Sequence, residues 1–382
     1  MKYCAVICEL NPFHSGHEYI LRRAREVSGC DRVIALMSGA FVQRALPACL
    51  DARSRAECAL RYGADMVIEL PVIYSSASGE VFAKGAIGIL DTLPEITHLV
   101  MGAENADKAL LERIARVRVN ENEEFSEAIG RGLSGGLSYA RALTAAVCSL
   151  AGGDPIETER ALSCPNNILA AAYASALLAR GSKIEFTPVA RARDPEKYAS
   201  ASELRADEGT ETAERFMPPV AREIWLNRRP NDVMRHYGTL LLYALRTRSA
   251  EEIASTPDCA EGFENKLKSL SRSCRNFDEL LRTVPTSRFT RGRIMRICLH
   301  NLLGIRRDMQ KSGYVCAKLT GIRAEAKDML SLLPQNIIVN KQGESAIPSG
   351  QINCFEADRR ASDLWALLAE RRCDFYSRLL VV

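Results

Sequence analysis

Two histidines, His14 and His17, lie on either side of Gly16, shortly after a short apolar run, Tyr3–Cys8. The turn between the run and the histidines spans residues 9–13, and a helical pattern begins at Gly16. At the end of a parallel strand, such a turn points free backbone N–H groups and the positive end of a helix at a phosphate. Gly16 lets the backbone approach the ligand, and both imidazoles can donate to α- or β-phosphate oxygens as charge develops on them. We therefore expect a nucleoside triphosphate site with His14 and His17 as catalytic residues.

Histidines at this spacing can also pack against a helix or cap it without any catalytic role. The strand before the motif and the amphipathic helix after it are the context that a nucleotide-binding motif requires, and they favour the functional interpretation. A metal site is not expected, because the remaining histidines, His98, His236 and His300, are scattered along the chain.

A second candidate group lies at residues 199–205, which read Ala-Ser-Ala-Ser-Glu-Leu-Arg. This segment is similar to the Ser-x-Ser/Thr-x-Ile-Arg signature that closes the other side of the site in HxGH nucleotidylyltransferases. Hydroxyl groups at a helix start and a nearby arginine supply donors for the β- and γ-phosphates and for leaving pyrophosphate. Ser202 and Arg205 are the candidates, and an ordinary N-capped helix is the alternative.

These residues need a strand before them and a helix behind them, and the first hundred residues supply that alternation. Apolar runs at 33–37, 66–70 and 97–101 alternate with helical patterns at 16–28, 51–62 and 81–90. The alternation predicts an α/β fold with a Rossmann-like, doubly wound parallel sheet.

Beyond residue 106 the pattern is helical at 139–150 and 167–180, with one further strand-like run at 184–189. We expect the sheet to close near residue 210. This gives a nucleotidylyltransferase-like ATP-binding domain at 1–210 and a mainly helical domain at 211–382, with a mixed segment at 336–340.

The composition is that of an ordinary globular protein: 47% of the 382 residues are hydrophobic and 26% are charged, which excludes a disordered or collagen-like chain. The net charge of +4 means that a polyanionic partner would need a local basic surface.

The thirteen cysteines form no CxxC pair, and several, such as Cys4, Cys8, Cys148 and Cys298, lie in apolar segments. With no secretory leader evident, we expect a reducing cytoplasm and no disulfide-linked partner. No apolar run approaches the roughly 20 residues that span a bilayer, so no membrane association is expected.

The motifs together resemble one family, the tRNA(Met) cytidine acetate ligases of the HIGH-type nucleotidylyltransferase superfamily. The segments that carry the resemblance are 9–17, 37–44, 51–60, 65–71, 82–86, 101–104, 165–169, 260–267, 287–305 and 359–368. They cover nearly the whole chain.

The resemblance implies an enzyme that adenylates acetate with ATP and transfers the acetyl group to N4 of the wobble cytidine of elongator tRNA(Met). ATP is converted to AMP and pyrophosphate, and a carbon–nitrogen bond forms. A consistent mechanism is in-line attack of an acetate oxygen on the α-phosphate, assisted by Mg²⁺, with both histidines stabilising the added charge. No protein nucleophile is needed.

The resemblance also implies which residues bind ATP. They are Ile7, Cys8, Glu9, Leu10, Asn11, Pro12, Phe13, His14, Ser15, Gly16, His17, Glu18, Tyr19, Ile20, Gly102, Asn166, Asn167 and Arg191. Gly102 follows a predicted strand, where ligands bind in open α/β sheets, although an ordinary turn glycine would look the same. Asn166 and Asn167 open a helix and could equally be caps. Arg193 could serve in place of Arg191.

The chain departs from the family pattern at three places. Leu10 stands where the family usually has Tyr, and Ser15 where it usually has Asn. The segment after Arg191, residues 192–198, lacks the glycine that is typical there. This third departure bears on the local backbone and on the contacts with the nucleotide.

The segment 281–307 contains arginines and no acidic residue. Its interleaved apolar residues suggest an amphipathic helix whose exposed side meets RNA phosphates; a solvated charged face is the alternative. The candidate RNA-binding residues are Arg288, Arg291, Arg293, Arg296, Arg306 and Arg307. Lys311, Lys318, Arg323 and Lys327 could extend the patch.

Two other functions fit the same motifs. One is a small-molecule nucleotidylyltransferase acting on a phosphorylated metabolite, which would leave about 170 helical residues unexplained. The other is a non-catalytic protein that binds ATP and RNA. No general base is evident: Asp51 and Glu69 lie near predicted sheet ends, and we interpret both as structural charges.

Overall fold

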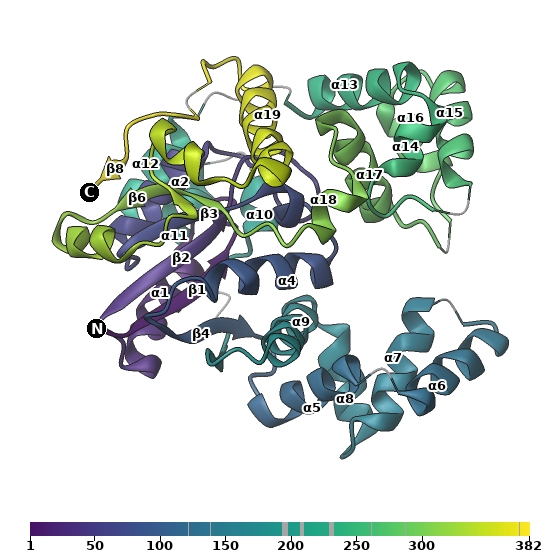
Figure 1. Cartoon of the computed structure of the whole chain (residues 1–382), viewed down its shortest axis with the longest axis horizontal. Coiled ribbons are helices and arrows are strands. Elements are labelled where there is room, and N and C mark those ends of the chain that lie inside the picture. The colour runs from purple at the N-terminus through teal and green to yellow at the C-terminus, as the bar shows by residue number, and fades with distance from the viewer. Residues whose placement is uncertain are drawn as a thin grey trace.

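The centre of the protein is a sheet whose strands alternate with helices, as shown in a computed structural model (Figure 1). The structure describes residues 1–120, 122–137, 139–192, 198–206, 210–228, 233–260, 262–286, 288–373 and 375–382. Five strands are parallel: β1 (Tyr3–Cys8), β2 (Arg32–Ser38), β3 (Met66–Leu70), β4 (Ile96–Ala103) and β5 (Glu185–Ala190). Their order is β5-β4-β1-β2-β3, which confirms the predicted Rossmann-like α/β fold.

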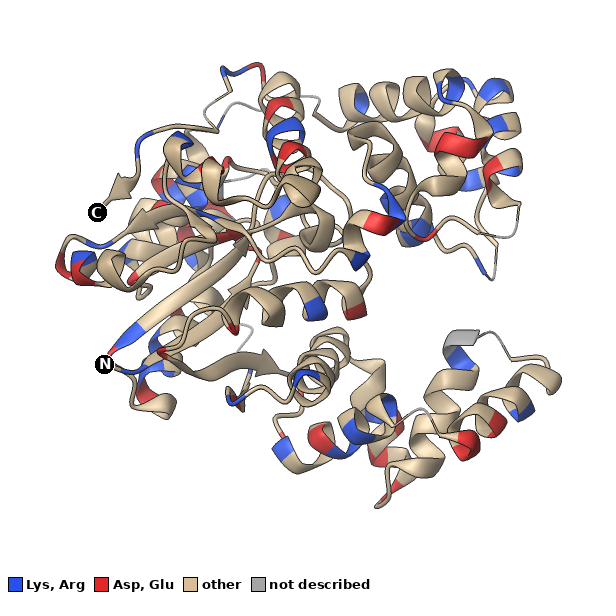
Figure 2. Cartoon of the chain, viewed as in Figure 1, with Lys and Arg blue, Asp and Glu red and all other residues tan. Residues whose placement is uncertain are grey.

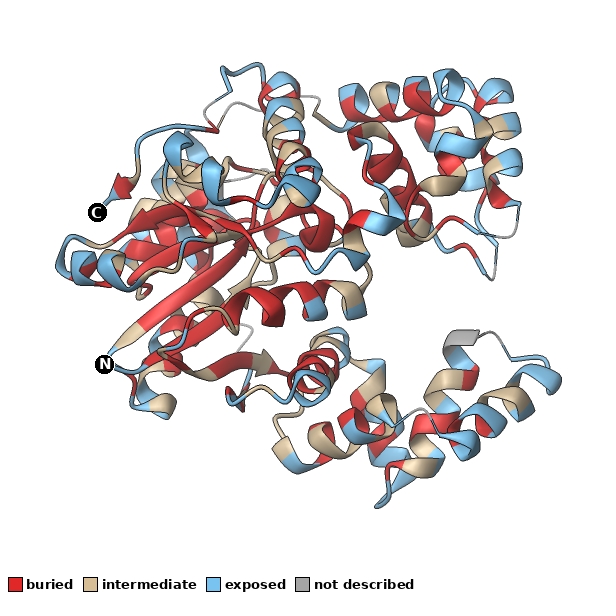
Figure 3. Cartoon of the chain, viewed as in Figure 1, coloured by how far each residue is buried: buried red, intermediate tan, exposed pale blue. Residues whose placement is uncertain are grey.

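Successive side chains of the parallel strands point to opposite faces of the sheet, and each face has its own core. On one face, Val33 and Ala35 of β2 pack with α1 (Ser15–Ser28) and α2 (Ala52–Arg61). On the other face, Ile34 and Leu36 pack with α4 (Gly79–Leu90) and α9 (Pro165–Arg180). The strands read as continuous apolar runs because both faces are covered, and Figure 3 shows them almost entirely buried.

The chain returns to this sheet near its C-terminus, so the expectation that the sheet closes near residue 210 is wrong. Strand β6 (Ala317–Ile322) pairs antiparallel with β3, and β7 (Ile337–Ile338) and β8 (Leu380–Val381) pair with β6. The mixed segment predicted at 336–340 contains β7. The sheet is therefore mixed, with parallel strands in the majority.

Strand β6 escaped sequence analysis because it carries polar residues in largely buried positions. The Lys318 ammonium lies 3.0 Å from the Glu69 carboxylate of β3, and the Thr320 hydroxyl donates to Glu69 at 2.5 Å. Burial raises the pKa of Glu69, but the Lys318 charge and the hydrogen bonds from Thr320 and Lys318 outweigh it, so the pKa lies below its ordinary value. Glu69 is thus a structural charge, as predicted, and Lys318 belongs to the sheet and not to an RNA-binding patch.

The remaining helices form two units beside the sheet and a layer over it (Figure 1). One unit contains α5 (Lys108–Val119), α6 (Glu123–Ser134), α7 (Tyr139–Leu150) and α8 (Pro155–Ser163). The other contains α13 (Val233–Thr247), α14 (Ala250–Ser255), α15 (Phe263–Ser273), α16 (Phe277–Thr283) and α17 (Arg291–Leu303). The layer over α1 and α2 consists of α10 (Ala201–Ala206), α11 (Thr210–Phe216) and α12 (Pro219–Leu226).

The C-terminal helix α19 (Ile352–Leu368) contacts both the second helical unit and the sheet, and its Arg360 donates to the Leu303 carbonyl of α17 at 2.7 Å. Its Asp358 accepts a hydrogen bond from the Val72 N–H at 2.6 Å, at the start of α3 (Val72–Ser75). Its Trp365 donates to the Ala48 carbonyl at 2.7 Å. Between α17 and β6 lies α18 (Arg307–Lys311), and β6 leads into a 3₁₀ segment, η1 (Ala324–Leu332). In the described part of the chain, no helix has the length and apolar character to span a membrane.

Replacing Lys318 by Met tests the role of the charge pair in this return to the sheet. We expect the free energy of unfolding to fall by about 3 kcal/mol, because the variant leaves the Glu69 carboxylate without its partner in a largely buried position. Urea denaturation followed by circular dichroism measures the change.

The matched control is Lys84→Met, which breaks the exposed Lys84–Glu80 pair on α4, where the charges are 2.8 Å apart. That loss should stay below about 1 kcal/mol. Adding Glu69→Gln to the Lys318 variant should restore part of its stability, since the unpaired charge is removed. Equal losses from the two lysine variants would contradict the assignment.

Candidate active site

His14 and His17 form the first turn of α1 and hold each other in place. The His14 Nδ1 accepts a hydrogen bond from the Gly16 N–H at 3.0 Å, and the His17 Nδ1 accepts from the His14 N–H at 3.3 Å. This is a reciprocal N-cap, with the two ring centroids 3.9 Å apart. Because each Nδ1 is an acceptor, each neutral ring carries its proton on Nε2. Within the described residues, neither Nε2–H group has a hydrogen-bond partner, so both can donate to a ligand.

Gly16 is required because the His14 ring lies over it. A Cβ at this position would lie 2.9 Å from the His14 Cε1 atom, closer than a real contact allows. Behind the pair, the buried Phe13 ring packs 5.6 Å from His17 and stacks 5.5 Å from Tyr62. The capping interactions that sequence analysis offered as an alternative to catalysis are thus present, and they orient the imidazoles.

Both imidazoles are held in the neutral form. Burial, followed by the charges of Arg191 and Arg205, lowers the pKa of His14 to about 3. Burial, followed by His14 and Arg191, lowers the pKa of His17 well below its ordinary value. The positive charge of the site therefore comes from the arginines, and the histidines contribute neutral N–H donors.

Arg205 reaches the histidine turn from α10. Its guanidinium donates to the Asn11 carbonyl and, at 3.1 Å, to the Ser202 hydroxyl. The start of α10 is closed by Ser200 and Glu203, which exchange backbone–side-chain hydrogen bonds of 3.2 and 2.6 Å. Ser200 is thus a helix cap, whereas Ser202 and Arg205 lie beside the nucleotide turn, as predicted.

Gly102, Asn166, Asn167 and Arg191 come together at the ends of β4 and β5 around one carboxylate, Glu104. The Arg191 guanidinium lies 3.6 Å from Glu104, the Asn166 amide donates to it at 2.5 Å, and the Asn167 N–H donates at 3.2 Å. A Cβ on Gly102 would lie 3.2 Å from the Arg191 Cγ atom, so the glycine makes room for this side chain.

Asn167 has a donor that fits a nucleotide. Its side-chain oxygen accepts from the Asn105 N–H at 3.2 Å, but its buried Nδ2 has no partner within the described residues. A buried amide N–H without an acceptor is costly unless a ligand or water satisfies it. The residues present therefore fit a nucleotide at this edge of the sheet.

The histidine turn and the residues gathered around Glu104 lie on the two sides of the point where the strand order reverses. Strand β1 lies between β2 and β4, and the crevice at the carboxyl ends of β1 and β4 is where open α/β sheets bind ligands. Ile20 of α1 extends toward Gly102, since a Cβ on that glycine would lie 4.0 Å from the Ile20 side chain. The structure thus brings the predicted turn residues and the distant Gly102, Asn166, Asn167 and Arg191 to one site.

The other residues of the turn mainly shape its backbone. Leu10 is buried and has φ of 51°, which is uncommon for a residue with a side chain. Asn11 accepts from the Cys49 N–H at 2.7 Å, and Ser15 donates to the Phe216 carbonyl at 2.5 Å. Ile7, Cys8, Glu9, Pro12, Glu18 and Tyr19 complete the stretch. Of the segment after Arg191, residues 193–197, with Arg193, lie outside the described residues.

Sequence analysis missed Arg55, which is fully buried in α2. Its guanidinium donates to the carbonyls of Glu9 at 2.8 Å, Ser38 at 2.7 Å and Leu50 at 3.1 Å, and also to that of Gly39. Arg55 lies in the segment 51–60, one of those that carry the family resemblance, and this resemblance was the signal that could have revealed it. Glu104 was missed in the same way: the segment 101–104 was noted, but no role was assigned to Glu104.

The basic segment 281–307 differs from the expected amphipathic helix. Most of α17 is buried, and His300 near its end is a core residue whose Nε2 lies 3.0 Å from the Ser76 hydroxyl. Arg296 pairs with Asp258 at 2.6 Å, and Arg293 donates to the Asp258 carbonyl at 2.8 Å. The acid that compensates Arg296 comes from another part of the chain, so the expectation of an uncompensated basic face is wrong for Arg296, and Arg293 is tied to the backbone of the same residue.

The other arginines of the segment are split between structural and exposed positions. Arg306 pairs with Asp308 at 3.2 Å, and Arg307 donates to the carbonyls of Ala254 and Cys259. Arg288 and Arg291 are exposed.

Among the possible extensions of the patch, Lys311 is exposed at the end of α18. Arg323 and Lys327 follow β6 on the side of the sheet remote from α17 (Figure 1) and belong to a different surface. Figure 2 shows both blue and red residues on the unit formed by α13 to α17.

The protonation of the two histidines can be measured directly. In ¹H–¹⁵N spectra of the imidazole nitrogens, we expect His14 and His17 to show the Nε2–H tautomer and no titration between pH 8 and pH 5, because burial lowers both pKa values. The exposed His236 supplies the reference signal of a solvent-accessible ring. The folded-state pKa of His14 lies below the ordinary value of about 6.5. As the pH falls below that value, the unfolded chain binds a proton at His14 before the folded chain does, so the free energy of unfolding decreases. A charged imidazole at either site at pH 6 would contradict the assignment.

Comparison with known proteins agrees with this geometry. Residues 1–377 match the family described as HIGH Nucleotidyl Transferase. The tRNA(Met) cytidine acetate ligase of Thermoanaerobacter sp. (strain X514) is 32% identical over 388 residues, covering 96% of this chain and 95% of the relative. The one from Caldanaerobacter subterraneus subsp. tengcongensis is 30% identical, with both chains fully covered.

Solved structures show the same fold. The crystal structure of Thermotoga maritima TmcAL bound with alpha-thio ATP has a TM-score of 0.90 to this chain and 28% sequence identity, and each chain is covered completely. The apo form of the same protein also has a TM-score of 0.90. With nearly full-length matches in sequence and in fold, the chain belongs to the HIGH nucleotidyl transferase family and, within it, to the tRNA(Met) cytidine acetate ligases.

Proposed function

We propose that this protein is an ATP-dependent ligase that adenylates acetate and transfers the acetyl group to N4 of the wobble cytidine of elongator tRNA(Met). The observation that carries the proposal is the pair of neutral imidazoles, whose Nδ1 atoms are used in the helix cap, beside Arg191 and Arg205 at the strand-order reversal. The names of the full-length relatives supply the tRNA substrate.

In the first step, an acetate oxygen attacks the α-phosphate of ATP in line with the leaving pyrophosphate, giving acetyl-adenylate. Charge builds on the phosphate oxygens, and the Nε2–H groups of His14 and His17 are placed to donate to them. Arg205, fixed by Asn11 and Ser202, and Arg191, fixed by Glu104, balance the charge of the phosphates. The asparagine pair fits the remaining polar groups of the nucleotide.

Mg²⁺, if bound with ATP, would neutralise phosphate charge. The described residues contain no group of three or more side chains suited to hold a metal, so the ion would be held mainly by phosphates and water.

In the second step, the N4 amino group of cytidine attacks the acetyl carbonyl, AMP leaves, and one proton leaves N4. The amino group is a weak nucleophile, which is why the acid must first be activated, and close placement in one site supplies much of the rate. A reducing cytoplasm, where tRNA is present, fits the thirteen free cysteines.

Replacing His17 by Asn tests the adenylation step. The variant removes an oriented N–H donor, and we expect the rate of acetate-dependent exchange of pyrophosphate into ATP to fall about 100- to 1000-fold. Mass analysis of nucleosides from tRNA(Met) should show a matching loss of N4-acetylcytidine.

The matched control is His236→Asn, at an exposed histidine of α13, which should leave the exchange rate unchanged. Exchange that depends on a phosphorylated metabolite and not on acetate would support a small-molecule nucleotidylyltransferase. Binding of ATP and tRNA without any exchange would support the non-catalytic alternative.

The pH dependence of the same exchange reaction gives an independent check. Because burial lowers the pKa of both histidines, with His14 at about 3, kcat/KM should show no inflection near pH 6.5 that belongs to these rings. The rate is measured from pH 5.5 to 8 at saturating Mg²⁺. An inflection near 6.5 that disappears in the His17 variant would overturn the neutral-donor mechanism.

A further inference from the structure

The second helical unit contains a groove that no step of the adenylation uses. It has a volume of about 1040 Å³ and runs between α13, α16 and α17. Arg44 and Leu46, from the segment between β2 and α2, also line it, so the groove joins the helical unit to the sheet. Its floor contains the buried side chains of Leu242, Phe277 and Met295.

Positive charge dominates the lining of the groove. The charged residues that line it are Arg44, Arg235, Arg246, Arg275, Arg291 and one acid, Asp278. Arg246 is fixed by hydrogen bonds to the carbonyls of Ser271 and Cys274 at 2.8 and 2.7 Å. Arg44 and Arg291 are exposed. The positive charge along the groove complements the negative charge of a chain of phosphates.

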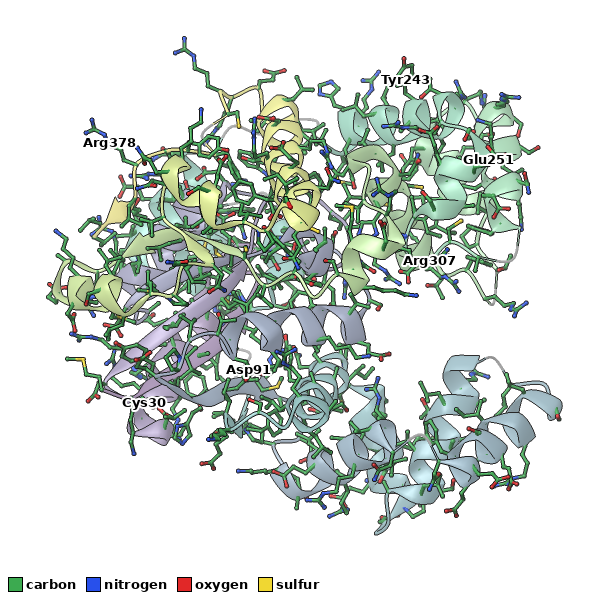
Figure 4. The ribbon with its side chains drawn as sticks, viewed as in Figure 1. Cys30, Asp91, Tyr243, Glu251, Arg307 and Arg378 are labelled. Atoms are coloured by element: carbon green, nitrogen blue, oxygen red, sulfur yellow. The ribbon has the colours of Figure 1, made fainter. Side chains whose placement is uncertain are left out.

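Exposed apolar side chains accompany the charge. Tyr243 of α13 is 65% exposed and Met234 is 53% exposed, and both line the groove. Figure 4 shows the labelled Tyr243 on the outer side of the second helical unit. An exposed aromatic ring beside arginines is a stacking surface for an unpaired base, whereas an acidic peptide would need the arginines alone.

One end of the groove is fastened to the nucleotide turn. The Tyr237 hydroxyl of α13 donates to the Ala45 carbonyl at 2.7 Å, which fixes the position of the segment that carries Arg44. The neighbouring Gln43 N–H donates to the Glu9 carboxylate at 2.8 Å, and Arg44 is close enough for its charge to act on Glu9. Residues 43–46 therefore connect the groove to the turn that precedes the histidines.

We propose that this groove binds single-stranded nucleotides of the tRNA anticodon loop, with Tyr243 stacking on an unpaired base and Arg291 contacting a phosphate. The inference rests on the proposed function and adds the surface that presents the loop to the acetyl-adenylate. It retains Arg291 as an RNA contact, whereas Arg293, Arg296 and Arg307 make hydrogen bonds to other parts of the protein.

The test compares Tyr243→Ala, Tyr243→Phe and Arg291→Gln in the full-length protein. We expect Tyr243→Ala to raise the KM for tRNA(Met) about tenfold and Tyr243→Phe to restore most of the loss, since the stacking ring is kept. Arg291→Gln should reduce by about one the slope of log affinity against log salt concentration, measured by fluorescence anisotropy with a labelled anticodon stem-loop. Acetate-dependent pyrophosphate exchange without tRNA should be unchanged in all three variants.

The matched control is Arg378→Gln, at an exposed arginine near the C-terminus, which Figure 4 shows on the opposite side of the molecule from Tyr243. It should change neither the KM nor the salt slope. If the unmodified protein acetylates tRNA(Met) while the groove variants keep its affinity, the groove inference fails and the proposed function stands. If the unmodified protein shows no acetate-dependent product, the proposed function itself fails. Displacement of the labelled stem-loop by a polyglutamate peptide as readily as by unlabelled RNA would instead indicate a site for acidic peptides.

Discussion

A single buried cation, the guanidinium of Arg55, holds the edge of the sheet on which the nucleotide site is built. It binds the carbonyls that follow β1 and β2 and that of Leu50 before α2. Ser38 is the last residue of β2, and Glu9, Gly39 and Leu50 lie outside the strands; leaving their carbonyls buried without donors would be costly. Burial lowers the pKa of Arg55, and the surrounding carbonyls accept the hydrogen bonds of its charged form. The shape of the Glu9–Asn11 turn, and with it the position of both histidines, depends on this contact.

The chemistry of the site follows from ordinary helix capping. The bonds that close the first turn of α1 use the Nδ1 atoms of His14 and His17, so in the proposed mechanism their protonated Nε2 atoms donate to the phosphates. The same burial that keeps the rings neutral excludes water around them, which strengthens each donor. Helix capping and the proposed catalytic role of the HxGH motif are therefore compatible, because the cap sets the tautomer and the orientation that this role requires.

The second helical unit is tied to this site through the segment between β2 and α2. Tyr237 holds that segment from one side and Glu9 holds it from the other, through the backbone of Gln43. Trp365 and Asp358 of α19 anchor the C-terminal part of the chain nearby, through hydrogen bonds with the backbone of Ala48 and Val72. Under our proposal, these contacts fix the position of the groove relative to the histidine turn.

The sequence alone determined the parallel core of the sheet, the position of the HxGH turn and the family. Buried parallel strands read as apolar runs, and a glycine between two histidines at a strand end is a local pattern that needs no tertiary information. The motif of Arg205 and Ser202 lies within one helix turn and could be read locally, and the structure places Arg205 against the Asn11 carbonyl. Local pattern could not reveal β6, since Lys318 and Thr320 are polar and become compatible with the sheet only when Glu69 of β3 faces them. Nor could it show that Arg296 is neutralised by Asp258, that Arg55 links two strand ends, or that Glu104 gathers Asn166, Asn167 and Arg191. Each of these depends on which distant side chain lies opposite, and only the tertiary structure decides that, because the free energy of a buried charge or polar group is set by its partner and not by its own residue type.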